Sequence, residues 1–150
     1  MMDDAFPESD RIEGIRHPRE TYQIFGQDSA QNLFLDAFGS NRLHHAWLIS
    51  GPKGVGKATL AWAMARFVLA SDQERGGSKT LRIDPDTAIA RRIASLGEPR
   101  LCLVRRPYDT DKKRLKTQIT VDEIRKLKSF FDRNCATWFA SSIRIKSPIR

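Results

Sequence analysis

The sequence contains no long apolar run and only two cysteines. No stretch approaches the roughly 18 apolar residues of a membrane-spanning helix, and the acidic N-terminus lacks the apolar segment of a secretory signal. Cys102 and Cys135 lie far apart and form no metal-ligand motif. We therefore expect a cytoplasmic protein with no membrane partner and no bound zinc.

Acidic residues become scarce toward the C-terminus. The net charge is +8 but uneven, because residues 1–36 hold eight acids and three bases, whereas residues 100–150 hold five acids and fourteen bases. This asymmetry predicts a polyanion partner for the last third of the chain. A solvated basic surface would have the same composition, and charge alone does not separate the two.

Short apolar patterns separated by glycine and proline predict an α/β domain with a parallel sheet. Apolar residues recur at helical spacing over 28–39, with a cap at Asp28–Ser29 and a stop at Gly39. Residues 46–49 are continuously apolar, which is typical of a strand covered on both faces. The remaining expectations are helices over 60–69, from about 85 to 96 and from a capping box at 120–123 through 131, a strand over 101–104, and loops over 71–79 and 105–118.

A glycine-rich segment with the pattern Gly-x4-Gly-Lys follows the first expected strand. Its residues are Gly51, Pro52, Lys53, Gly54, Val55, Gly56, Lys57, Ala58 and Thr59. Glycines let successive backbone N–H groups face one concavity at a helix N-terminus, a shape that holds a polyphosphate. We expect the N–H groups of residues 54–57 to hold a β-phosphate and Lys57 to bridge β and γ oxygens, so the segment predicts an ATP or ADP site.

This phosphate loop lacks the hydroxyl that usually ligates Mg²⁺. Ala58 stands where the pattern has Ser or Thr, and Thr59 is no substitute because one further residue rotates a helical side chain by roughly 100°. No acid directly follows the expected strand over 101–104, where ATPases hold the metal. We therefore expect nucleotide binding with a poor Mg²⁺ site, no catalytic residue and no hydrolysis by this chain alone.

Several stretches together resemble a known family. They are 17–21 (His-Pro-Arg-Glu-Thr) with 25–27 (Phe-Gly-Gln), 42–49 (Arg-Leu-His-His-Ala-Trp-Leu-Ile), the phosphate loop, and 119–127 (Ile-Thr-Val-Asp-Glu-Ile-Arg-Lys-Leu). Over roughly residues 17–131 the chain resembles the delta-prime subunits of bacterial DNA polymerase III clamp loaders, which are AAA+ proteins. The loop is common to many ATPases, so residues 43–48 and 121–127 carry most of the specificity.

The resemblance implies an αβα P-loop NTPase (AAA+) domain in a ring with tau/gamma and delta subunits. Such a ring opens a sliding clamp and places it on primed DNA, and its delta-prime member is a non-catalytic accessory subunit of the polymerase holoenzyme, often poor in hydrolysis. The helix from Val121 would lie near the DNA, with Arg125, Lys126 and Lys128 as the DNA-proximal residues. Phosphate contacts of this kind are sequence-independent and sensitive to salt.

The end of the chain departs from the family pattern. Residues 132–150 differ from the expected continuation of further strands, a lid and a collar domain, and residues 70–100 lack the four-cysteine zinc module of many relatives. We therefore expect a flexible N-terminal arm (1–24), the N-terminal part of an AAA+ domain (25–131) and an atypical basic tail (132–150). The hypothesis for this tail is a truncated or frameshifted gene product.

Two other functions fit parts of the sequence. A small stand-alone P-loop ATPase or kinase would use the same loop but would need a carboxylate for Mg²⁺. A basic nucleic-acid-binding module would use residues 112–114 and 125–128 and would ignore ATP. Phosphate release and the salt dependence of DNA binding distinguish these functions from that of a clamp-loader subunit.

Overall fold

The structure is a computed structural model that describes residue 8, residues 11–134 and residues 142–146. Within these ranges the chain divides into two units. The larger unit comprises residues 16–98 and a strand at 142–146, and the smaller comprises the N-terminal segment to residue 15 together with residues from 99 onward, as far as the end of the last helix. None of the helices in these ranges is both long and apolar enough to cross a membrane.

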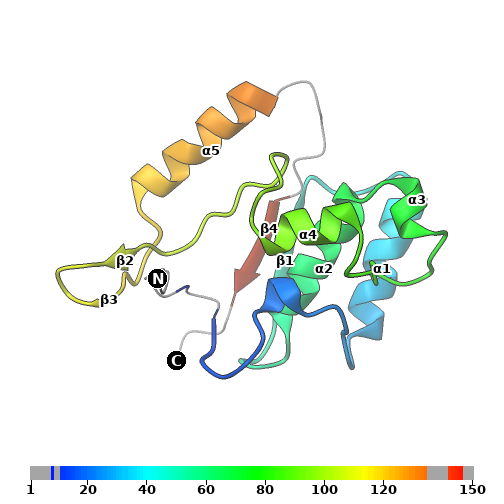
Figure 1. Cartoon of the computed structure of the whole chain (residues 1–150), viewed down its shortest axis with the longest axis horizontal. Helices are drawn as coiled ribbons and strands as arrows, with labels where there is room; N and C mark the ends of the chain where they lie inside the picture. Colours follow the sequence, from blue (N-terminus) through cyan, green and yellow to red (C-terminus); the bar gives the residue numbers. More distant parts are fainter. Residues whose placement is uncertain (1–7, 9–10, 135–141, 147–150) are drawn as a thin grey trace. The chain divides into compact units, whose positions relative to one another are not determined.

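The larger unit mixes helices with a pair of parallel strands. Its elements are η1 (Pro18–Glu20), α1 (Asp28–Gly39), β1 (Ala46–Ser50), α2 (Lys57–Leu69), α3 (Asp72–Arg75), α4 (Ala88–Ala94) and β4 (Ser142–Lys146). Figure 1 shows these elements around α2. β1 and β4 run parallel, with Ala46 opposite Ser142 and Ser50 opposite Lys146. This combination confirms an α/β domain, but the described partner of β1 is a strand that the sequence did not predict.

The core of the larger unit forms around α2. This helix contacts η1, α4, β1 and β4, and its Leu60 and Met64 are 1% and 2% exposed. From α1, Phe34 packs edge-to-face on Trp47 with ring centroids 5.1 Å apart. The buried apolar residues are Phe34, Leu60, Trp62, Ala63, Met64, Phe67, Ala70, Leu81, Ile83, Ile89, Ala90 and Ile93. The burial of Trp62 and Met64 confirms that they are packing residues.

A buried arginine ties the segment before α1 to this core. Arg66 is 1% exposed, and its guanidinium donates hydrogen bonds to the carbonyl oxygens of Arg19 at 2.6 Å and Thr21 at 2.8 Å. Burial lowers the pKa of Arg66 to about 10, although Tyr22 opposes this shift, so the side chain stays charged at neutral pH. Several residues of the expected flexible arm therefore pack against α2, including His17, which is also buried.

β1 differs from the strand covered on both faces that its apolar run predicted. Along the strand, exposed and half-buried residues alternate, and Leu48 is 61% exposed. Alternate residues of a strand share a face, and here Trp47 lies on the face that packs against α1. In the part of the chain that the structure describes, no contact covers the other face, which agrees with the exposure of Leu48.

The segment between α2 and α4 is more structured than expected. The predicted loop over 71–79 contains α3, because Ser71 and Glu74 form a capping box. α4 begins after Thr87, whose hydroxyl accepts from the Ala90 N–H, rather than at Pro85. It ends before Leu96, which has a φ of 56° and lies outside the buried face of the helix.

The smaller unit contains α5 (Val121–Asn134) and a hairpin of β2 (Tyr108–Asp109) and β3 (Arg114–Leu115). The helix confirms the element expected from Val121 through Phe131. The predicted strand over 101–104 is wrong, since the described structure pairs it with no other strand. Instead, the expected loop over 105–118 forms the hairpin, because the Asp109 carboxylate accepts from the Lys112 N–H at 3.0 Å and closes the turn.

Candidate functional site

The phosphate loop lies between β1 and α2, the order that the sequence predicted. Gly54 and Gly56 have left-handed backbones with φ of 87° and 85°, and Gly56 is the N-cap of α2. This conformation favours glycine and turns neighbouring N–H groups toward one side at the start of the helix. Pro52, Lys53, Gly54 and Val55 are exposed, so a ligand can reach the loop from solvent.

Lys57 folds back onto the loop that precedes it. The residue is 7% exposed, and its Nζ donates to the carbonyl oxygens of Gly51 at 2.9 Å and Pro52 at 2.5 Å. These bonds engage two of the three donors of the ammonium group. The positive charge is thus held against the loop, where a phosphate group would compete with two neutral carbonyls for it.

Gln27 makes a contact with the loop that the sequence did not reveal. It is the N-cap of α1, so the expected cap at Asp28–Ser29 is wrong, yet its side chain makes no capping bond. Instead its amide donates to the carbonyl oxygen of Val55. A Cβ on Gly56 would lie 3.1 Å from Gln27 Nε2. The contact joins residues far apart in sequence. The only sequence signal at this position is that Gln27 ends the Phe-Gly-Gln stretch (25–27) of the family resemblance.

The loop fits a polyphosphate better than it fits the accompanying metal ion. Ala58 and Thr59 are the second and third residues of α2, and both are half-buried. The methyl group of Ala58 offers no oxygen at the position from which a hydroxyl usually ligates Mg²⁺. The left-handed glycines and the Lys57 ammonium suit an anion, whereas the donor set for the cation is incomplete.

The basic residues of α5 are exposed and partly paired within their own helix. Arg125 lies 2.9 Å from Asp122, and Lys126 lies 2.5 Å from Glu123. Exposed pairs of this kind contribute about 0–1 kcal/mol, so a phosphate could replace either acid. Lys128 is exposed on the same helix. These side chains and the phosphate loop belong to different units.

Two of the three histidines, His17 and His44, contact neighbouring residues. His17 Nδ1 accepts from the Arg19 N–H at 3.1 Å, and the His44 ring lies edge-to-face on Trp47. Cys102 is half-buried, whereas Cys135 lies outside the described residues. His45 is exposed.

Comparison with known proteins identifies the family. The family model described as "DNA polymerase III, delta subunit" matches residues 26–145. The DNA polymerase III subunit gamma of Buchnera aphidicola subsp. Schizaphis graminum (strain Sg) is 39% identical over 49 residues, which are 33% of this chain and 14% of that protein. The same subunit from Buchnera aphidicola subsp. Acyrthosiphon pisum (strain APS) is 37% identical over 49 residues, with the same shares covered.

The family match includes the phosphate loop, the hairpin and α5, and it continues through residue 145. It therefore enters the stretch from residue 132 that was expected to depart from the family pattern. The matched segment spans only 14% of the length of the two gamma subunits. Because the family model covers most of its length, the chain belongs to the DNA polymerase III delta subunit family.

Proposed function

We propose that this chain is a delta-prime-type subunit of the bacterial DNA polymerase III clamp loader. In this role it joins tau/gamma and delta subunits in a complex that loads the sliding clamp onto primed DNA during replication. The observation that carries the proposal is the family match over residues 26–145, within which the phosphate loop has left-handed glycines and a folded-back lysine. The gamma-subunit relatives support the same complex.

The proposed domain is of the AAA+ type. Its support is the chain order of β1, phosphate loop and α2, with β1 in a parallel pair. In a parallel α/β sheet, ligands bind beyond the carboxyl ends of the strands. The loop leaves the carboxyl end of β1 at Ser50, which is the position that a nucleotide would take in such a domain.

The loop is proposed to bind ATP or ADP through its backbone and Lys57. The N–H groups of residues 54–57 would hold phosphate oxygens, and Lys57 would exchange the carbonyls of Gly51 and Pro52 for a charged partner. The ammonium–carbonyl bonds are already charge-assisted, but only a phosphate adds Coulomb attraction between two opposite charges. The exchange therefore favours the bound state, even though the ammonium already has partners in the free chain.

Hydrolysis is proposed to be left to other subunits. Ala58 supplies no oxygen to Mg²⁺, and a bound nucleotide without a well-held metal loses much of its charge stabilisation during phosphoryl transfer. The similarity to gamma subunits favours one alternative, an ATPase subunit of gamma type. That alternative predicts turnover by this chain, as does a stand-alone P-loop enzyme.

Reconstitution tests this proposal. The full chain is mixed with bacterial gamma-type and delta subunits, and the assemblies are analysed by native mass spectrometry with phosphate release measured in parallel. We expect the chain to enter the complex and to release no phosphate by itself. If gamma-type and delta subunits assemble with each other but exclude this chain, the proposal is wrong. Turnover by the chain alone that is lost in Lys57→Ala would instead establish an ATPase.

A further inference from the structure

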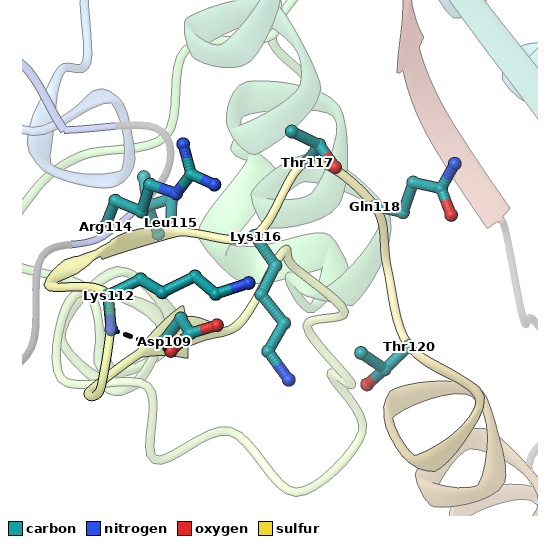
Figure 2. A pocket seen from close by; sticks show the side chains of 8 residues that line it. All are labelled: Asp109, Lys112, Arg114, Leu115, Lys116, Thr117, Gln118 and Thr120. Atoms are coloured by element: carbon teal, nitrogen blue, oxygen red, sulfur yellow. Dashed lines mark hydrogen bonds between the residues drawn. The ribbon is translucent and has the colours of Figure 1, made fainter.

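A cavity of about 390 Å³ lies beside the β2–β3 hairpin in the smaller unit. Figure 2 shows it between the hairpin and the segment that leads into α5. Its lining residues are Asp109, Lys112, Arg114, Leu115, Lys116, Thr117, Gln118 and Thr120. Three of these residues are cations and one is an acid, so positive charge dominates the lining.

The cations of this cavity are not paired in the way that those of α5 are. Arg125 and Lys126 each face an acid on their own helix. In the part of the chain that the structure describes, Lys112, Arg114 and Lys116 take part in no ion pair. Like charges gathered around one cavity repel one another, and an anion placed among them would relieve that repulsion.

The single acid of the lining is occupied by the turn of the hairpin. Asp109 accepts from the Lys112 N–H at 3.0 Å. This hydrogen bond lowers the pKa of Asp109, and the charges of Lys112 and Lys116 add to the effect. The carboxylate is therefore ionised at neutral pH and holds the turn closed, while its one negative charge leaves the lining with a surplus of positive charge.

The side chains that face this space can donate hydrogen bonds to a phosphate. In Figure 2, Lys112 and Lys116 extend into the space between the hairpin and Thr120, whereas Arg114 points away from them. Thr117 and Thr120 add hydroxyl donors at the rim. No aromatic side chain belongs to this lining, so it offers no platform on which a base could stack. The features together suit a backbone phosphate rather than a nucleobase.

We propose that this cavity binds a backbone phosphate of DNA through Lys112 and Lys116. The choice of primed DNA as the ligand rests on the proposed clamp-loader function, but the contact itself needs only a phosphodiester. The cavity is formed by the hairpin that precedes α5 in the same unit. Its cations are therefore a second group of phosphate contacts, in addition to those expected of α5. Because the contact is with phosphate, binding is independent of base sequence.

A pair of double variants of the full chain tests the cavity. Lys112→Gln with Lys116→Gln removes the two cavity lysines and keeps the backbone bond to Asp109. Lys79→Gln with Arg82→Gln removes the same charge from two exposed basic residues of the larger unit, outside the lining. Binding of a fluorescent primed duplex is followed by anisotropy over a series of salt concentrations. We expect the steepness of the plot of log K against log salt to fall by about one in the cavity variant, because one phosphate contact is lost, and to stay unchanged in the control.

Two further experiments test whether charge at the cavity, and not a folding defect or a nucleotide site, explains the result. Lys112→Arg with Lys116→Arg keeps the charge and should restore the wild-type slope, which a folding defect would not do. Competition at constant ionic strength compares ATP and inorganic phosphate with the duplex, and neither should displace it as efficiently as unlabelled DNA. If ATP binding is lost in the cavity variant but kept in Lys57→Ala, the cavity is a nucleotide site and the proposal is wrong.

The result for the cavity can be distinguished from the result for the proposed clamp-loader function. Equal slopes for the cavity and control variants overturn the cavity proposal even if the chain assembles with clamp-loader subunits. A slope reduced only in the cavity variant supports it even if the chain fails to assemble, in which case the clamp-loader function is wrong. A wild-type chain without measurable affinity for the duplex also overturns the cavity proposal.

Discussion

The two units of the chain differ in how they hold their side chains. Among the residues whose burial the structure describes, all of the buried apolar ones lie between Phe34 and Ile93 in the larger unit. In the smaller unit, none of the described apolar residues is buried, and Val121, Ile124 and Phe131 of α5 are 66%, 51% and 43% exposed. The larger unit has an apolar core, whereas the described part of the smaller unit has ion pairs, a hairpin and an exposed apolar helix face.

This difference matches the two kinds of ligand site that we propose. A phosphate loop works through backbone N–H groups in fixed positions, so it needs a packed core behind it. Contacts to a DNA backbone need mainly positive charge at the right distance, and exposed elements supply that. The larger unit is therefore suited to shape-dependent binding of a nucleotide, and the smaller unit to charge-dependent binding of a nucleic acid.

The largest expected effect comes from truncating the core of the larger unit. Phe34 is fully buried and packs on Trp47, so Phe34→Ala should lower the free energy of unfolding by about 3–5 kcal/mol. Ile124→Ala on the exposed face of α5 should change it by about 0.5 kcal/mol or less. Urea denaturation followed by circular dichroism measures both. Similar losses for the two variants would show that α5 is as well packed as α1.

The next effect concerns the arginine that anchors the N-terminal segment. Arg66→Met removes the donors for the carbonyls of Arg19 and Thr21, and we expect a loss of about 2–3 kcal/mol. Arg42→Met, at an exposed position, is the control and should be nearly neutral. Hydrogen exchange of residues 17–22 reports where the loss occurs. Unchanged protection there in Arg66→Met would contradict the anchoring role.

A smaller effect is expected at the glycines of the phosphate loop. Gly56→Ala forces an L-residue to a φ of 85° and brings its Cβ within 3.1 Å of Gln27 Nε2. Gly54→Ala has a similar φ but no heavy atom within 4 Å of the new Cβ. A left-handed backbone costs a non-glycine residue about 1–2 kcal/mol at either position. The close contact with Gln27 should make Gly56→Ala the more destabilising of the two. Thermal unfolding of the two variants, with a Gln27→Ala background to remove the contact, measures the difference.

The smallest effect is a dependence of stability on pH at the α3–α4 corner. The Glu74 carboxylate accepts from the N–H groups of Ser71 and Ile89, and these bonds lower its pKa below the ordinary value of 4.5. Its contribution is therefore present above pH 4.5 and is lost as the pH falls through the lower pKa of the folded state. Glu74→Gln should flatten the Tm profile in this acidic range. If the dependence of Tm on pH is the same in Glu74→Gln, the Glu74 carboxylate does not contribute to it.

Local patterns predicted the long helices and the phosphate loop well. α1 and α5 have a sustained apolar period, and the loop is a motif whose glycines and lysine lie within a few residues of each other. The short elements were less predictable, because a strand needs a partner that the sequence does not identify. Residues 101–104 look like a strand but have no pairing in the described structure, whereas residues 105–118 gain a hairpin from one Asp109 hydrogen bond.

The contacts that the sequence could not predict join distant residues. Arg66 lies in the helix that was expected over 60–69, yet it is buried and donates to carbonyls more than forty positions away. Gln27 contacts Val55, which lies 28 positions away. The cavity beside the hairpin likewise exists only because the hairpin forms. The glycine-rich loop could be located from its residues alone, whereas the sequence indicated the basic run 112–114 but not the cavity beside the hairpin.

Calorimetric titration of nucleotide tests the central claim most directly. ATP and ADP are titrated into the wild-type chain, Lys57→Ala and the control Lys79→Ala, an exposed lysine outside the loop, each with and without Mg²⁺. We expect both nucleotides to bind the wild-type chain and Lys79→Ala with affinities that hardly depend on Mg²⁺, and Lys57→Ala to bind at least tenfold more weakly. No binding by the wild-type chain, or binding that requires Mg²⁺, would contradict the proposed nucleotide site.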